Sequence, residues 1–181
     1  MANWFIALSD SGHEWLRRVP APGAGVRSFV SDDLHMTVAF LGAVTAEKAH
    51  DCFEAARAIP LKALDAKLGE VQPMGHPRHA SALSALLDVD DAASRELGDA
   101  RDLLLARAGA RTDTRPLLPH VTLARITRGA SSDERRRALA WASALDLGRS
   151  RVRLTRLALY TRSADRATRL FDIVDTMELD S

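Results

Sequence analysis

Residues 33–42 read D-L-H-M-T-V-A-F-L-G, and this stretch decides which fold the sequence specifies. Its apolar residues and its threonine are typical of a β-strand, in which a histidine is unexpected. A second stretch, P-H-V-T-L-A-R-I-T-R at residues 119–128, repeats the pattern histidine, any residue, threonine, apolar residue. One copy begins at His35 and the other at His120, so the sequence predicts two strands of the same design.

The spacing within each copy places the histidine and the threonine together. Side chains at positions i and i+2 of a strand lie on the same face of the sheet. His35 and Thr37 therefore share one face, as do His120 and Thr122, while the apolar residues between them can anchor each strand in a core. If an approximate twofold axis relates two lobes, both imidazoles and both hydroxyls can converge on one groove.

Two imidazoles and two hydroxyls suit proton transfer at a phosphate. Because the unperturbed histidine pKa is about 6.5, one neutral ring can accept a proton from water while a protonated ring donates one to a leaving alkoxide. Each transfer typically contributes about 10²–10⁴-fold in rate. Threonine hydroxyls can donate hydrogen bonds to non-bridging phosphate oxygens. This chemistry requires neither a metal nor another cofactor. One such histidine is usually structural, but two in equivalent contexts argue for a shared site.

The composition indicates a globular protein. The chain has 181 residues, of which 46% are hydrophobic and 27% are charged, with a net charge of +1. This length suits one compact domain or two small lobes that share a core, and we expect residues 1–181 to form a single bilobal domain. The near-neutral charge argues against a broad basic face that coats long nucleic acid, but it permits binding of a nucleotide or an RNA end.

The single cysteine and the hydropathy pattern constrain the class of protein further. Cys52 alone cannot form an intramolecular disulfide or a cysteine-based zinc site, and its helical surroundings predict a small core residue. We find no secretory signal and no apolar run of the roughly 20 residues that a membrane span needs. We therefore expect a cytoplasmic, monomeric protein with no membrane partner.

The rest of the chain predicts an α+β fold. Mostly antiparallel sheets with helices on one side are expected, because short strands follow one another closely. The predicted strands are 3–9, 26–30, 35–43, 62–74, 81–89, 115–127, 151–160 and 168–179, and the predicted helices are 11–19, 45–59, 91–108 and 131–146. Thr45 and either Ser131 or Ser132 are expected helix N-caps, Gly109 a helix terminator and Gly69 a bulge.

With its two His-x-Thr motifs, the sequence resembles the two-histidine phosphoesterases, and among them the bacterial and archaeal RNA 2′,3′-cyclic phosphodiesterases, historically called 2′-5′ RNA ligases. The matching stretches are NWFIALS, LHMTVAFLGAV, LPHVTLARI and VRLTRLALYTRS, in the family's order and spacing over essentially the whole chain. The resemblance implies a bilobal α+β fold with pseudo-twofold symmetry, two mostly antiparallel sheets flanked by helices and a central cleft. It also implies hydrolysis of an RNA-terminal or nucleoside 2′,3′-cyclic phosphate to a 2′-phosphomonoester.

The resemblance also implies a role for each residue of the repeated motif. His35 would be the general acid that protonates the departing 3′ oxygen, and His120 the general base that activates water. Thr37 and Thr122 would hold the phosphate oxygens. Arg125 matches an arginine that follows the second motif in many relatives and would bind the phosphate or the nucleotide. A pseudo-symmetric site could exchange the roles of the two histidines.

The chain departs from the expected pattern in two ways. Arg125 lies five residues after His120, so an unbroken strand would point it to the opposite face, and only a bend, twist or bulge brings it to the site. Many relatives carry an aromatic residue in the strand after the central loop, where this chain reads HPRHASAL. Phe40 could supply base stacking in its place.

His76 and His79 form a further histidine pair, in the loop GHPRH. The stretch lacks acidic ligands, so a metal site is disfavoured there. With Arg78, the two histidines could line the mouth of the cleft and contact RNA.

Two other functions fit the same residues. Reversible 2′-5′ RNA ligation or hydrolysis would use the same site. A nucleotide-binding module could instead hold a nucleoside monophosphate between the two His-Thr pairs without turnover.

Overall fold

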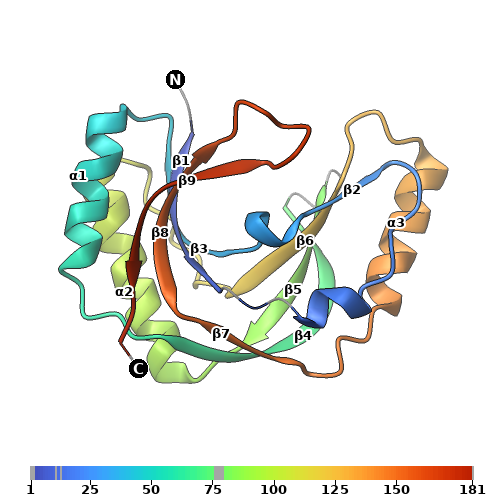
Figure 1. The fold of residues 1–181 in the computed structure, drawn as a ribbon, viewed down its shortest axis with the longest axis horizontal. Coiled ribbons are helices and arrows are strands. Elements are labelled where there is room, and N and C mark those ends of the chain that lie inside the picture. Colours follow the sequence, from blue (N-terminus) through green and yellow to red (C-terminus); the bar gives the residue numbers. More distant parts are fainter. Residues whose placement is uncertain (1–2, 11, 13, 76–79, 181) are drawn as a thin grey trace.

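The computed structural model describes residues 3–10, 12, 14–75 and 80–180. Within these residues the fold consists of two antiparallel β-sheets with α-helices on their outer sides (Figure 1), which confirms the predicted α+β class. None of the described helices combines the length and the apolar composition needed to cross a membrane.

The two sheets contain the strands predicted from the sequence. In the described residues the first sheet has the strand order β3-β1-β8-β9 and the second β2-β6-β5-β4-β7, and all neighbouring strands pair antiparallel. The first comprises β1 Trp4–Ser9, β3 Met36–Gly42, β8 Arg156–Arg162 and β9 Phe171–Glu178. The second comprises β2 Val26–Ser28, β4 Leu64–Met74, β5 Ala82–Asp88, β6 His120–Ile126 and β7 Arg151–Leu154. The register of β4 against β5 shifts between Leu68 and Val71, which confirms the bulge predicted at Gly69.

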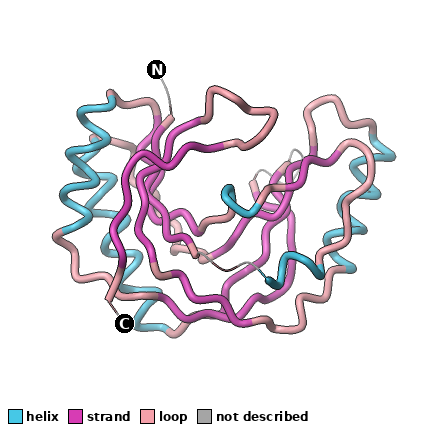
Figure 2. Tube along the Cα trace, viewed as in Figure 1, coloured by secondary structure: helices cyan, strands magenta, loops and turns pink. Residues whose placement is uncertain are grey.

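The helices cover the two sheets from opposite ends of the molecule (Figure 2). The α-helices are α1 Ala46–Arg57, α2 Asp91–Ala108 and α3 Ser132–Ala144, and two 3-10 helices are η1 Glu14–Arg18 and η2 Ser31–Asp33. Helix α2 packs against β3 and α1, whereas α3 packs against β4. Cys52 is fully buried in α1, as predicted.

The helix ends follow the sequence signals. The Thr45 side chain accepts a hydrogen bond from the Lys48 backbone N–H at 3.2 Å, and Ser131 forms a capping box with Glu134. Gly109 ends α2 with φ 66°, a left-handed conformation that glycine adopts without steric cost. The two side-chain caps and the left-handed glycine confirm the predicted caps and terminator.

One prediction about the strands is wrong. The sequence predicts one strand over residues 151–160, but the structure divides this segment at Thr155. Strand β7 pairs with β4 in the second sheet, while β8 pairs with β1 and β9 in the first. The Thr155 N–H donates to the Ser9 carbonyl at 3.1 Å and the Thr155 carbonyl accepts from Leu179 at 2.7 Å, so the backbone stays hydrogen-bonded as it passes between sheets.

Candidate active site

The two motif strands meet where the sheets come together. β3 belongs to the first sheet and β6 to the second, and the two strands contact each other near the middle of the molecule (Figure 1). His35 immediately precedes β3, and His120 is the first residue of β6. The fold therefore brings together the two histidine motifs, which lie far apart in the sequence.

Strand β3 contains a bulge just after its His-x-Thr motif. Thr37 lies opposite Ala7 of β1, but Ala39 rather than Val38 lies opposite the next β1 residue, Ile6. Val38 and Ala39 are both buried, so the alternation of faces shifts by one residue. The side chain of Phe40, 54% exposed, consequently emerges on the face of His35 and Thr37.

Strand β6 contains the same bulge at the equivalent position. Thr122 pairs with Ser84 of β5, whereas Ala124 pairs with the neighbouring Leu83. Leu123 and Ala124 are both buried, and Arg125 is exposed on the face of His120 and Thr122. The bend that Arg125 needs in order to reach the site is therefore present.

The bulges reveal that the repeat is longer than the His-x-Thr motif. Both copies follow the pattern histidine, apolar, threonine, apolar, alanine, variable, apolar, and Phe40 and Arg125 occupy the same variable position. The seven residues from His35 and from His120 also show the same sequence of buried, half-buried and exposed side chains. The shared alanine, at Ala39 and Ala124, is visible in the sequence and extends the repeat beyond the His-x-Thr motif.

The two imidazoles are held in the same way. Nδ1 of His35 lies 2.7 Å from the Asp33 carbonyl oxygen, and Nδ1 of His120 lies 2.7 Å from the Leu118 carbonyl oxygen. A carbonyl oxygen can only accept a hydrogen bond, so Nδ1 of each ring donates. This arrangement leaves Nε2 of both rings for proton transfer.

The surroundings of His35 make its imidazole hard to protonate. Its ring centroid lies 4.7 Å from that of Phe5, 5.1 Å from Tyr160 and 5.3 Å from Phe171. Burial among these rings, together with the smaller effects of the His120 and Arg125 charges, lowers the pKa of His35 to about 4, although the hydrogen bond that its ring donates to the Asp33 carbonyl opposes the shift. His120 and Arg125 are thus close enough to act on the His35 charge.

A pocket opens beside the two motifs. Thr37, Phe40 and His120 line one pocket of about 510 Å³. Its remaining walls include apolar residues, Met74, Leu105, Leu117 and Leu118, and charged residues, Arg101, Arg111, Asp113 and Arg115. The combination of an exposed aromatic ring, apolar walls and guanidinium groups suits a planar base carried on a phosphate.

Thr122 has a hydrogen-bond partner that the sequence did not predict. Its hydroxyl lies 3.0 Å from the hydroxyl of Ser84, which is fully buried on the paired strand β5. A hydrogen bond donated by Ser84 leaves the proton of Thr122 free for a bound anion.

Solved structures share this arrangement of strands and helices. No protein-family profile matches the sequence, and no curated protein sequence matches it. Escherichia coli LigT in complex with 3′-AMP superimposes with a TM-score of 0.71 and 21% identity over 99% of both chains. A crystal structure described as a phosphoesterase gives a TM-score of 0.70 and 21% identity over 100% of both chains. The protein TT0787 of Thermus thermophilus gives a TM-score of 0.70 and 18% identity over 98% of this chain and 97% of that one.

The chain has the LigT fold. This confirms the predicted two-histidine phosphoesterase architecture. His76, Arg78 and His79 lie outside the described residues, so their predicted place at the mouth of the cleft stays a prediction.

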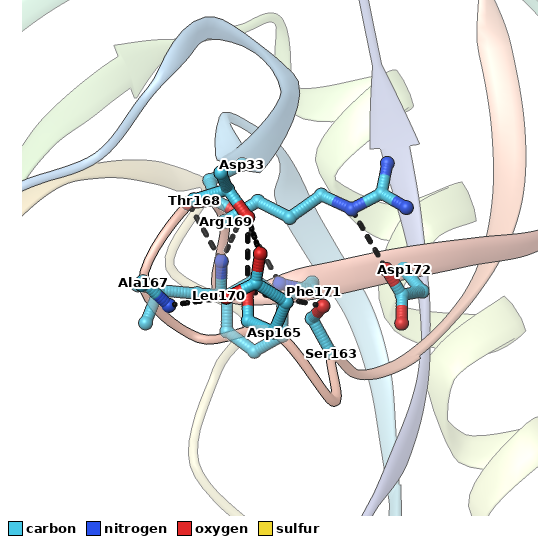
Figure 3. Close-up of polar contacts among 9 residues, drawn as sticks. All are labelled: Asp33, Ser163, Asp165, Ala167, Thr168, Arg169, Leu170, Phe171 and Asp172. Carbon is cyan, nitrogen blue, oxygen red and sulfur yellow. Dashed lines mark hydrogen bonds and ion pairs between the residues drawn. The ribbon is translucent and has the colours of Figure 1, made fainter.

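Within this LigT-like fold, Asp33 connects His35 to the loop between β8 and β9. Its carboxylate, 1% exposed, accepts backbone hydrogen bonds from Leu170 at 2.8 Å and Phe171 at 3.1 Å (Figure 3), while its carbonyl holds His35. Burial raises the pKa of Asp33, although the N–H groups of Leu170 and Phe171 oppose that rise. Asp33 could not be predicted from the sequence, because its partners lie at the other end of the chain.

Proposed function

We propose that this chain is a phosphodiesterase that hydrolyses RNA-terminal or nucleoside 2′,3′-cyclic phosphates to 2′-phosphomonoesters with two histidines and no metal. The supporting observation is the pair of His-x-Thr motifs on contacting strands, each imidazole held through Nδ1 by a backbone carbonyl. LigT, which shares the fold, was crystallised with 3′-AMP, NADP+ and ATP, and this supports nucleotides as the ligand class.

The reaction needs one proton acceptor and one proton donor. The base takes a proton from water as its oxygen attacks phosphorus, and the bond from phosphorus to the 3′ oxygen breaks. The acid gives its proton to that oxygen, so the 2′ ester remains and one proton has moved through each imidazole. Hydroxyl protons of Thr37 and Thr122 would stabilise the charge on the non-bridging oxygens, with Ser84 orienting Thr122.

The resemblance assigns His35 as the acid and His120 as the base, and this assignment requires that His35 be protonated when the substrate is bound. If His35 is the acid, it must be protonated, yet its pKa is about 4 in the free protein. A bound phosphate brings a negative charge that favours the protonated ring. We propose that His35 gains its proton on substrate binding and that His120 acts as the base. Exchanged roles would instead use the neutral His35 ring as the base.

Phe40 and Arg125 would fix the nucleotide on either side of the reacting phosphate. Phe40 offers an exposed ring on the His-Thr face of β3 for the base, and Arg125 offers a guanidinium on the same face of β6 for the phosphate.

A direct test measures turnover of an oligonucleotide that ends in a 2′,3′-cyclic phosphate, with EDTA present. We expect a 2′-phosphate product at an unchanged rate. Loss of activity on chelation would contradict the metal-free mechanism, a joined product from RNA fragments would indicate ligation, and tight nucleotide binding without turnover would indicate a binding module.

The catalytic pair is tested with His35→Ala and His120→Ala. Each should lower kcat/KM by at least about 10²-fold, because each removes one proton transfer. Circular dichroism should show an intact fold. The pH profile of the wild type should be bell-shaped. If substrate raises the pKa of His35, the loss of activity at alkaline pH should occur at a higher pH in the kcat profile than in the kcat/KM profile. Full activity in both variants would reject these residues as the catalytic pair.

A further inference from the structure

Three arginines from separate parts of the chain gather around Arg125. Arg27 of β2 lies directly opposite Arg125 in the antiparallel pairing, which puts both side chains on one face of the sheet. Arg162 ends β8, and Arg166 follows in the loop before β9. Although the Arg125 side chain reaches solvent, partial desolvation of its guanidinium first, and then the charges of Arg162 and Arg166, lower the pKa of Arg125. The four residues, Arg27, Arg125, Arg162 and Arg166, are called the arginine cluster below.

The cluster is organised by contacts of its own. The Arg27 guanidinium donates a hydrogen bond to the backbone carbonyl of Arg166, which links β2 to the loop between β8 and β9. Asp33 holds the far end of the same loop through Leu170 and Phe171. The loop is thus fastened to the second sheet on one side and to the His35 segment on the other.

The described residues balance little of the cluster's positive charge: the Arg27 charge lowers the pKa of the Asp33 carboxyl, but the two groups form no ion pair. Among the described residues, no ion pair joins any of the four arginines to an acidic side chain, whereas Arg169 in the same loop pairs with Asp172 at 2.7 Å. The buried carboxylate of Asp33 is occupied by two backbone N–H groups. Like charges held side by side repel one another, so the arrangement favours a bound anion.

The cluster is separate from the Phe40 pocket and adjoins the reacting centre from another side. None of its four members lines that pocket. Arg125 shares a strand face with His120 and Thr122, and its charge reaches His35. An anion held by Arg27, Arg162 and Arg166 would lie next to Arg125.

We propose that Arg27, Arg162 and Arg166 form a second phosphate subsite, which takes the 5′-phosphate of the terminal nucleotide. In an RNA strand this is the phosphodiester that links the last nucleotide to the rest of the chain. This inference rests on the proposed function, since it adds a second anion subsite to the same site.

The first test compares adenosine 2′,3′-cyclic phosphate with and without a 5′-phosphate. We expect the 5′-phosphate to raise kcat/KM about 10-fold or more, as expected for charge-assisted hydrogen bonds to guanidinium groups. The double variant Arg162→Gln/Arg166→Gln should reduce that gain to about 3-fold or less. The control Arg153→Gln removes one charge from β7, outside the cluster, and should keep the full gain.

A second test does not depend on turnover. Calorimetry compares adenosine 3′,5′-bisphosphate with 3′-AMP, with salt concentration varied. The bisphosphate should bind about 10-fold more tightly, and the double variant should lose that preference and show a shallower salt dependence. Equal affinities in the wild type, or a preference that survives in the double variant, would overturn the subsite. Hydrolysis of neither cyclic phosphate, with the binding preference intact, would reject the proposed activity but keep the subsite.

Discussion

The two histidines occupy equivalent positions but unequal surroundings. Both rings donate from Nδ1 to the carbonyl two residues earlier in the chain. His35 lies among three aromatic rings, whereas His120 lines the open pocket beside Phe40. The sequence repeat therefore gives the two rings the same backbone hydrogen bond, while the rest of the fold buries the His35 ring among aromatic side chains and lowers its pKa.

The lowered pKa of His35 makes stability depend on pH. The unfolded chain binds a proton at His35 below pH of about 6.5, but the folded protein does so only below about 4, so stability falls as pH drops through this window. Because the side chain keeps some solvent contact, we expect this residue to account for about 1–3 kcal/mol of that loss. Urea unfolding at pH 7 and pH 4.5 measures it, and His35→Asn should show a smaller difference. An identical difference in the variant would contradict the lowered pKa.

The exposed ring of Phe40 should act on substrate binding and not on stability. Phe40→Ala should raise KM for an adenosine substrate about 10-fold, since stacking of a base on an aromatic ring contributes about 1–3 kcal/mol. Leu103→Ala is the matched control, because Leu103 in α2 is 50% exposed and lines no part of the pocket. Steady-state kinetics and a melting curve for each variant separate the two effects. An unchanged KM would remove Phe40 from the site.

Among the secondary-structure elements, the sequence predicted which strands carry the candidate site. It did not predict the bulges within those strands. The alternation of polar and apolar residues placed His35 with Thr37 and His120 with Thr122. It did not predict that Arg125 would join them, because a bulge depends on the register with a neighbouring strand. Register is set by long-range pairing, which a local pattern does not contain.

The link between η2 and the loop before β9 should depend on the Asp33 carboxylate. Asp33→Asn replaces one acceptor oxygen with a donor that faces the N–H groups of Leu170 and Phe171, so we expect a loss of about 1–3 kcal/mol. Urea unfolding measures the loss, and hydrogen exchange at these two amides should become faster. Asp32→Asn changes the exposed neighbouring carboxylate and serves as the control. Equal stability of the two variants would contradict this role.

At the scale of the whole molecule, one hydrophobic cluster contains side chains from both sheets. It includes Ile6 and Leu159 of the first sheet and Leu83 and Leu123 of the second. The sequence predicted two lobes with a shared core, but it did not predict that one run of residues crosses between the sheets at Thr155. The residue pattern of 151–160 is continuous along its length. The segment forms two strands because its first half pairs with β4 and its second half pairs with β1.

The crossing at Thr155 should therefore affect both sheets together. Thr155→Pro removes the N–H that donates to the Ser9 carbonyl, and we expect a loss of about 1–3 kcal/mol in the free energy of unfolding. Thr155→Val keeps that N–H and is the matched control. Because the sheets share one hydrophobic cluster, tryptophan fluorescence and far-ultraviolet circular dichroism should report a single coincident urea transition in each protein. Two separate transitions in the proline variant would show that the sheets unfold independently, and that the crossing strand, rather than the shared cluster, couples them.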